Sequence, residues 1–174
     1  IGADTLLLEC ARMLLEHGHD LVAVVAGSTR VAAWATERGV PVLDADDRSW
    51  IGAVDALQPD YLFAVTHLRL LPPEAIAVAR RMAINFHDGP LPEYAGLNTP
   101  VWGLLRGELE WGVSWHRLTD GIDTGDILVQ DRFPISPRDT SLSLNTSNVD
   151  HALDTFALLL QQLEHGTLAP TPQE

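Results

Sequence analysis

The sequence predicts an α/β protein with a doubly wound, mainly parallel, Rossmann-like sheet. Short apolar runs such as 21–26 and 60–65 are rich in valine or aromatic residues, a pattern typical of strands covered on both faces. Segments with helical apolar spacing separate these runs, and alternating strands and helices favour a parallel sheet. Two later strands that follow each other within 112–133 predict a C-terminal hairpin.

The expected elements alternate along most of the chain. A helix begins shortly after Gly2, and a Gly- and Pro-rich loop occupies 88–98. The remaining elements are strand 21–26, helix 29–39, strand 40–43, helix 49–57, strand 60–65, a helix opened by Pro72 and Pro73, strand 82–87, helix 100–105, strands 112–118 and 127–133, and a closing helix at about 140–164.

The domain prediction is one globular domain over residues 1–166. Ile1 and Gly2 read as the end of a first strand that is truncated upstream. Residues 167–174 contain two prolines and no periodic pattern, which is the composition of a linker-like tail. We therefore expect neighbouring domains of a larger chain.

Composition excludes several classes of function. The formal charge is −13, and all eleven cations are arginine, so lysine Schiff bases and P-loop phosphate sites are absent. An acidic surface also repels phosphate backbones, which predicts no nucleic-acid partner. No apolar run approaches the length of a membrane span, and the lone Cys10 permits no disulfide framework, so we expect a cytoplasmic protein.

Asn85 and His87 are the first candidates for chemistry. They alternate with Ile84 and Phe86 in a predicted strand, so both side chains project from one face. In open α/β sheets, ligands bind at the carboxyl ends of strands, where this pair lies. The alternative is that the two side chains only hydrogen-bond the 88–98 loop.

A second candidate is the acidic turn at 120–126, DGIDTGD, which contains Asp123. Ser114 and His116 share a face of the strand that leads into it, so His116 is in a position to hold an acid of the turn. Acids with glycine also form ordinary turns, and His116 is equally well explained as a core histidine. No histidine pair has the spacing of a zinc site, which predicts no metal.

These residues carry a family resemblance. The run 85–96, NFHDGPLPEYAG, resembles the signature loop of the folate-dependent formyltransferases, as do 112–116, GVSWH, and 121–128, GIDTGDIL. The likeness extends from the first helix to about Gly166. It implies 10-formyltetrahydrofolate as co-substrate and transfer of its formyl group to an amine.

The resemblance also assigns roles to individual residues. It implies that Asn85 donates to the formyl oxygen, His87 stabilises the developing oxyanion and Asp123 manages protons, with Ser114 and His116 supporting them. The folate would lie against two segments, Leu68, Arg69, Leu70 and Leu71 in one and Thr119, Asp120, Gly121 and Ile122 in the other. Arg69 is alternatively a solvated loop cation.

The acceptor is constrained by two departures from the family. Purine-pathway members carry a phosphate-cradling loop where this chain has GADT at 2–5, and Asp4 disfavours a phosphate there. The barrel domain of the tRNA enzymes is not seen, which argues against initiator tRNA. We expect a small-molecule or carrier-protein-bound amine. A hydrolase that releases formate from the same folate, and a catalytically silent binding domain, are the alternatives.

Overall fold

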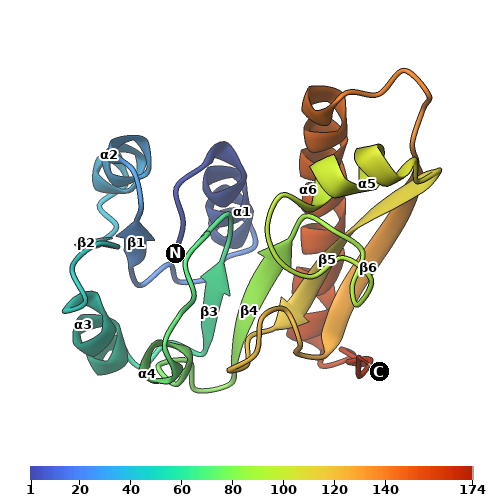
Figure 1. Cartoon of the computed structure of the whole chain (residues 1–174). Helices are drawn as coiled ribbons and strands as arrows, with labels where there is room; N and C mark the ends of the chain where they lie inside the picture. Colours follow the sequence, from blue (N-terminus) through green and yellow to red (C-terminus); the bar gives the residue numbers. More distant parts are fainter. Residues whose placement is uncertain (174) are drawn as a thin grey trace. The chain divides into compact units, whose positions relative to one another are not determined.

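The chain folds into two compact units, which the computed structural model describes over residues 1–173 (Figure 1). The first unit comprises residues 1–85, and the second begins at Phe86. The division falls inside strand β4 (Met82–His87), so one strand contributes residues to both units.

The first unit contains four strands that pair in parallel. Strand β1 pairs with β2, with Val24 opposite Val42, and β3 pairs with β4, with Tyr61 opposite Met82. Parallel pairing requires a crossover between partners, and helices supply these crossovers. The elements of this unit are α1 (Thr5–Glu16), β1 (Val24–Ala26), α2 (Thr29–Glu37), β2 (Val42–Asp44), α3 (Trp50–Leu57), β3 (Tyr61–Ala64), α4 (Pro73–Ile76) and most of β4.

Gly2 joins the two parallel pairs. It forms parallel bridges with Ala26 and with Val65, and its carbonyl accepts a hydrogen bond of 2.8 Å from the N–H of Gly27. A Cβ at this position would lie 1.9 Å from the carbonyl oxygen of Val65. Only glycine permits so close an approach of two backbones.

The helix boundaries follow the capping residues in the sequence. Ser28 accepts a hydrogen bond from the N–H of Val31 at the start of α2. Thr140 and Ser143 form a reciprocal capping box at the start of α6 (Ser141–His165), and Gly166 ends that helix with φ +66°. These contacts satisfy backbone groups that a helix end leaves unpaired.

The second unit is built on an antiparallel hairpin. Strands β5 (Glu110–Arg117) and β6 (Ile127–Pro134) pair from Glu110 opposite Pro134 to His116 opposite Ile127. Helix α6 packs along both strands, as Figure 1 shows, and the short helix α5 (Thr99–Arg106) contacts α6. The centroid of the Trp115 ring lies 4.9 Å from that of Phe156 of α6, at the centre of this core.

The predicted fold class is confirmed: the strands of the first unit are parallel, and the chain ends in a hairpin and a closing helix. The strand predicted at 21–26 is shorter than expected, since β1 begins at Val24. Val22 is 37% exposed, so this part of the apolar run is not covered. Apolar residues alone predict burial, whereas a strand also needs a partner for its backbone.

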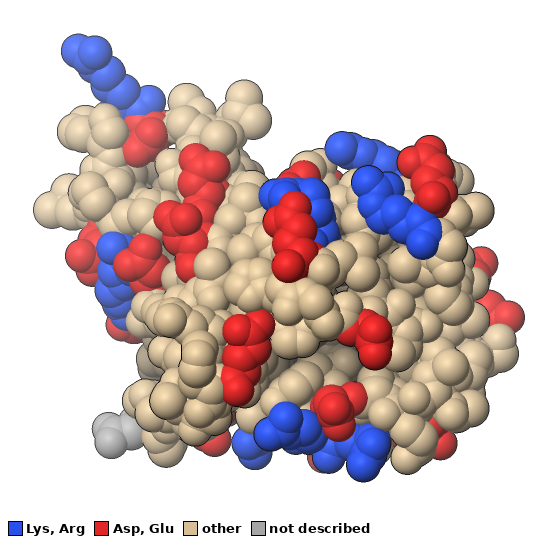
Figure 2. All heavy atoms as spheres, turned by 180° about the vertical axis from the view of Figure 1, so that it is seen from behind, with Lys and Arg blue, Asp and Glu red and all other residues tan. Residues whose placement is uncertain are grey.

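The chain carries a formal charge of −13, but its acidic surface is interrupted by arginine side chains (Figure 2). On the face shown in Figure 2, most arginine groups lie beside acidic ones. Within residues 1–173, no helix combines the length and the apolar character that crossing a bilayer demands.

Candidate active site

His87 ends strand β4 and is 5% exposed. Its Nε2 donates a hydrogen bond to the carbonyl oxygen of Tyr94, since a carbonyl can only accept. The other ring nitrogen, Nδ1, lies 3.4 Å from Oδ2 of Asp123. Both ring nitrogens therefore face acceptors, and the backbone contact fixes which nitrogen faces the carboxylate.

His116 approaches the same carboxylate from strand β5. Its Nδ1 donates to the carbonyl of Arg117 at 3.0 Å, and its Nε2 lies 3.4 Å from Oδ1 of Asp123. The pairing of β5 with β6 shifts register between Trp115 and His116, and such irregularities re-aim a side chain. The two imidazole rings are edge-on, with centroids 6.3 Å apart.

Asp123 lies between the two imidazoles. Its side chain is 13% exposed, and Oδ2 also accepts a hydrogen bond of 2.8 Å from the N–H of Gly96. Burial by itself raises the pKa of Asp123, but the hydrogen bond from His116, the charge of His87 and the Gly96 N–H together outweigh it. The pKa of Asp123 therefore lies below its usual value, and the group is a carboxylate at neutral pH.

In the turn that carries Asp123, the backbone packs closely against the end of strand β5. Asp123 has φ +51°, a left-handed conformation that is uncommon outside glycine and that aspartate tolerates better than most residues. A Cβ at Gly125 would lie 1.9 Å from the carbonyl oxygen of Arg117, so glycine is required there. The side chain of Gln173 donates from Nε2 to the carbonyl of Asp123 at 2.8 Å and to that of Gly125 at 2.6 Å.

Ser114 holds the loop that follows His87. Its hydroxyl donates to the carbonyl of Gly89 at 2.9 Å and accepts from the N–H of Leu91 and from Nε2 of Gln130. Ser114 is fully buried, so its hydroxyl can be satisfied only by these protein partners. This loop supplies both the Tyr94 carbonyl and the Gly96 N–H that contact the catalytic candidates.

The other predicted residues lie in two places. Asn85 is half-buried in β4 of the first unit, opposite Ala64, and its convergence with His87 on one carbonyl stays a prediction. Leu68 and Leu70, both in the first unit, are each 76% exposed, and Ile122 in the second is 55% exposed. The contact of these three residues with a folate stays a prediction. Arg69 is paired with Asp46.

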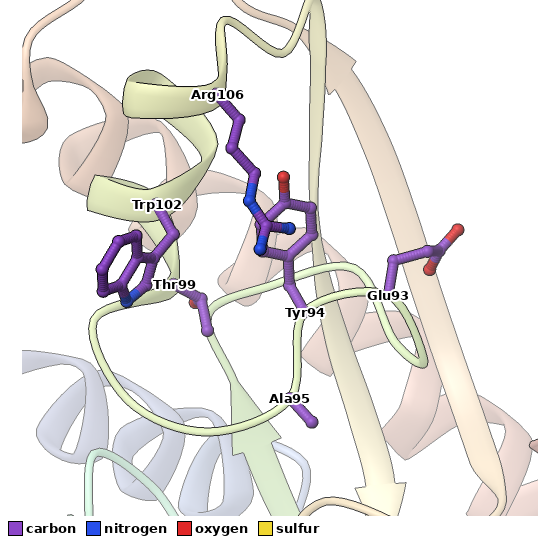
Figure 3. Close-up of a pocket in the computed structure, with 6 residues that line it drawn as sticks. All are labelled: Glu93, Tyr94, Ala95, Thr99, Trp102 and Arg106. Carbon is purple, nitrogen blue, oxygen red and sulfur yellow. The ribbon is translucent and has the colours of Figure 1, made fainter.

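A hollow of about 260 Å³ opens on the second unit beside Tyr94 (Figure 3). Trp102 and Arg106 of α5 flank it, and the guanidinium carbon of Arg106 lies 5.2 Å from the centre of the Tyr94 ring. Tyr94 donates from its hydroxyl to Glu108 at 2.6 Å, which fixes the ring. The full lining is Glu93, Tyr94, Ala95, Thr99, Trp102 and Arg106.

Comparison with known proteins identifies the family. Residues 16–159 match the family model described as formyl transferase, which is more than half of the chain. The chain belongs to the formyl transferase family. The resemblance recognised in the sequence is thereby confirmed, and the group formed by His87, His116 and Asp123 lies within the matched region.

One similar relative within this family is the methionyl-tRNA formyltransferase of Anaeromyxobacter dehalogenans. It is 32% identical over 189 residues, which cover 100% of this chain and 61% of the relative. This formyl transferase chain thus spans about three fifths of that relative's length.

Two solved structures share the fold. An N-formyltransferase from Helicobacter canadensis in complex with folinic acid and dTDP-3-aminofucose has a TM-score of 0.80 and 20% identity, covering 99% of this chain and 65% of that one. A formyltetrahydrofolate deformylase from Pseudomonas syringae pv. tomato has a TM-score of 0.82 and 20% identity, covering 95% and 60%. Transferases and a deformylase therefore share this fold.

Several contacts of the candidate site have no signal in the sequence. Tyr94 and Gly96 act through backbone atoms, which carry no residue-specific pattern. Gln173 lies fifty residues from Asp123 along the chain, in a segment without periodicity. Among residues 1–173, no group of three or more His, Cys, Asp or Glu side chains is arranged to hold a metal ion.

Proposed function

We propose that this chain transfers a formyl group directly from 10-formyltetrahydrofolate to an amine. The observation that carries the proposal is a carboxylate held between two imidazoles, 3.4 Å from each, at the end of a strand. This arrangement moves protons and stabilises charge, and direct transfer needs no covalent intermediate on the enzyme. Cys10 is not a candidate nucleophile, because burial raises the pKa of its thiol far above the usual range.

The proposed reaction has two stages, in which the bonds formed and broken and the protons moved are all accounted for. The amine nitrogen attacks the formyl carbon, which forms a C–N bond and places negative charge on the formyl oxygen and positive charge on the nitrogen. Collapse of this intermediate breaks the bond between the carbon and the folate nitrogen. One proton leaves the attacking amine, and one is delivered to the departing folate nitrogen, so no oxidant or metal is required.

We assign charge stabilisation to His87 in this reaction. Since its Nε2 is engaged by Tyr94 and its Nδ1 faces Asp123, the ring is proposed to act on the oxyanion through its electrostatic field rather than through a direct hydrogen bond. Asp123 stays ionised, which makes it a weak base, and it is better suited to hold an imidazolium and to pass a proton on. A direct hydrogen bond to the oxyanion is the role proposed for the Asn85 amide.

The folate is proposed to contact the segments 68–71 and 119–122. Leu68, Leu70 and Ile122 offer exposed apolar surface, which suits contact with a pterin ring. The pairing of Arg69 with Asp46 is consistent with a role in shaping the first segment rather than in binding charge. No metal enters the proposal.

The hollow beside Tyr94 is our candidate for the acceptor. Its aromatic and guanidinium lining suits a planar or anionic part of a small molecule, and Tyr94 also contacts His87 through its carbonyl. We therefore favour a small-molecule or carrier-bound amine, in a cytoplasmic protein. A second candidate acceptor is methionyl-tRNA, because a 32% identical relative bears the name methionyl-tRNA formyltransferase.

The experiment that tests this function is a turnover assay with 10-formyltetrahydrofolate. Tetrahydrofolate and formate are measured in parallel, with amino sugars, amino acids, carrier-bound amino acids and methionyl-tRNA as acceptors. Amine-dependent tetrahydrofolate release without formate supports transfer, whereas equal release of both without an amine identifies a hydrolase. Absence of turnover with every acceptor, together with folate binding, identifies a silent binding domain.

A further inference from the structure

The end of the described chain is attached to the turn that carries Asp123. Thr171 forms an antiparallel bridge with Ile127, in which each N–H donates to the other residue's carbonyl at 2.8 Å. Ile127 is the first residue of β6, directly after the turn. The bridge therefore brings the residues that follow Thr171 to the turn.

Gln173 uses this position to contact the turn itself. Its side-chain amide nitrogen donates to the carbonyls of Asp123 and Gly125, at 2.8 Å and 2.6 Å. A carboxamide has two N–H donors, so both are used on this one stretch of backbone. No other protein group donates to these two carbonyls in the hydrogen bonds described for residues 1–173.

The geometry of Asp123 makes such a contact consequential. Its φ of +51° is a conformation that a side chain disfavours, and surrounding contacts must hold it in place. In this conformation the carboxylate meets the Gly96 N–H at 2.8 Å and the two imidazoles at 3.4 Å. Contacts of this kind lose function when they shift by about 1 Å.

We propose that Gln173 is a positioning residue, which holds the backbone of Asp123 so that its carboxylate stays between His87 and His116. The expected effect on kcat rests on the proposed formyl transfer, whereas the contact between Gln173 and the turn is independent of it. The segment 171–173 thereby becomes part of the active-site architecture.

The substitution Gln173→Met tests the proposal, because methionine keeps the length of the side chain and removes both donors. We expect kcat to fall at least about tenfold, with the KM for the acceptor changed less than about twofold, since a small displacement near the reacting atoms acts on the chemical step. In Gln173→Glu, kcat should fall further, because a carboxylate would face the two carbonyl oxygens of Asp123 and Gly125. Gln161→Met, on the exposed face of α6, is the matched control and should leave kcat unchanged.

Two further readouts separate positioning from general destabilisation. The amide proton of Gly96, followed by NMR, should move upfield in Gln173→Met as its bond to the carboxylate lengthens. The acid limb of the profile of kcat/KM against pH should move to higher pH. The groups that lower the pKa of Asp123 are His116 from β5, His87 from β4 and the Gly96 N–H, and all three lose contact if the carboxylate shifts.

The outcomes are distinguishable. An unshifted Gly96 amide in Gln173→Met overturns the proposal, whether or not kcat changes, because the effect would then not pass through Asp123. An unchanged kcat also overturns it. If the wild-type chain transfers no formyl group, the proposed function fails, while the Gly96 amide still decides whether Gln173 holds the carboxylate.

Discussion

Asp123→Asn removes the charge at the centre of the site and preserves its shape. The carboxylate accepts from the Gly96 N–H at 2.8 Å and faces ring nitrogens of His87 and His116 at 3.4 Å each. An asparagine provides only one acceptor oxygen. Its NH₂ group would then point at one of the N–H donors around Asp123, and two donors cannot form a hydrogen bond. The two imidazoles lose the anion that stabilises their protonated forms.

The size of the effect follows from the distances. Two unit charges 3.4 Å apart interact by about 5 kcal/mol at an effective dielectric constant of about 20, which is the upper bound for the loss when an imidazole carries a proton in the transition state. Replacing the carboxylate that orients a catalytic imidazole by an amide lowers kcat by about 10⁴-fold in the best-studied case. We expect a loss of about 10³-fold to 10⁴-fold in kcat, which is about 4 to 5.5 kcal/mol of transition-state stabilisation.

The assay is tetrahydrofolate release under saturating folate and acceptor, with folding checked by circular dichroism. Asp126→Asn is the matched control, since it makes the same change of charge in the same turn. A kcat for Asp123→Asn within about threefold of wild type, in a folded protein, would refute the assignment of Asp123 to the chemical step. A fall in kcat for Asp126→Asn of similar size would show that net charge, not position, is responsible.

Four other outcomes follow from the same contacts. Gly103→Ala should lower the free energy of unfolding by about 1 to 3 kcal/mol in urea titrations, because the new Cβ would lie 2.2 Å from the Trp111 ring. Ser114→Ala should cost about 1 to 3 kcal/mol in the same titration, since a buried hydroxyl with three partners is lost. Trp102→Ala should raise the KM for the acceptor about twofold to tenfold and leave the KM for the folate unchanged, a result that steady-state kinetics checks. Burial, with the nearby positive charge of Arg69, lowers the pKa of His67 to about 4. The unfolded state therefore binds more protons between about pH 6.5 and 4, so the free energy of unfolding should fall on acidification through that window, and should fall less in His67→Gln.

Much of the fold was predictable because it depends on local patterns. The strand at 82–87 was predicted with the bounds that the structure gives. Its apolar run is interrupted only by Asn85 and His87, which lie on one face, as expected of a strand. The closing helix was predicted to start near Thr140, where the capping box is found. The strand at 21–26 was overestimated at its start, because a strand also depends on a partner that lies elsewhere in the chain.

Less of the candidate site was predictable. The side chains His87, His116 and Asp123 have residue types that indicate chemistry, and their motifs place them in strands and a turn. The contacts that orient them come from Tyr94 and Gly96 backbone groups, whose positions depend on the path of the loop. Backbone groups are the same in every residue, so no sequence pattern marks them.

By itself, the amino-acid order determined the class of fold and the family, and it singled out the acid and the imidazoles as candidates. These follow from periodicity, capping residues and short motifs, all of which act over a few residues along the chain. The tertiary structure decided which nitrogen of each ring faces the carboxylate, the lowered pKa of that carboxylate, and the attachment of Gln173 to its turn. These depend on distances between residues that are far apart in the chain, and such distances exist only after the chain has folded.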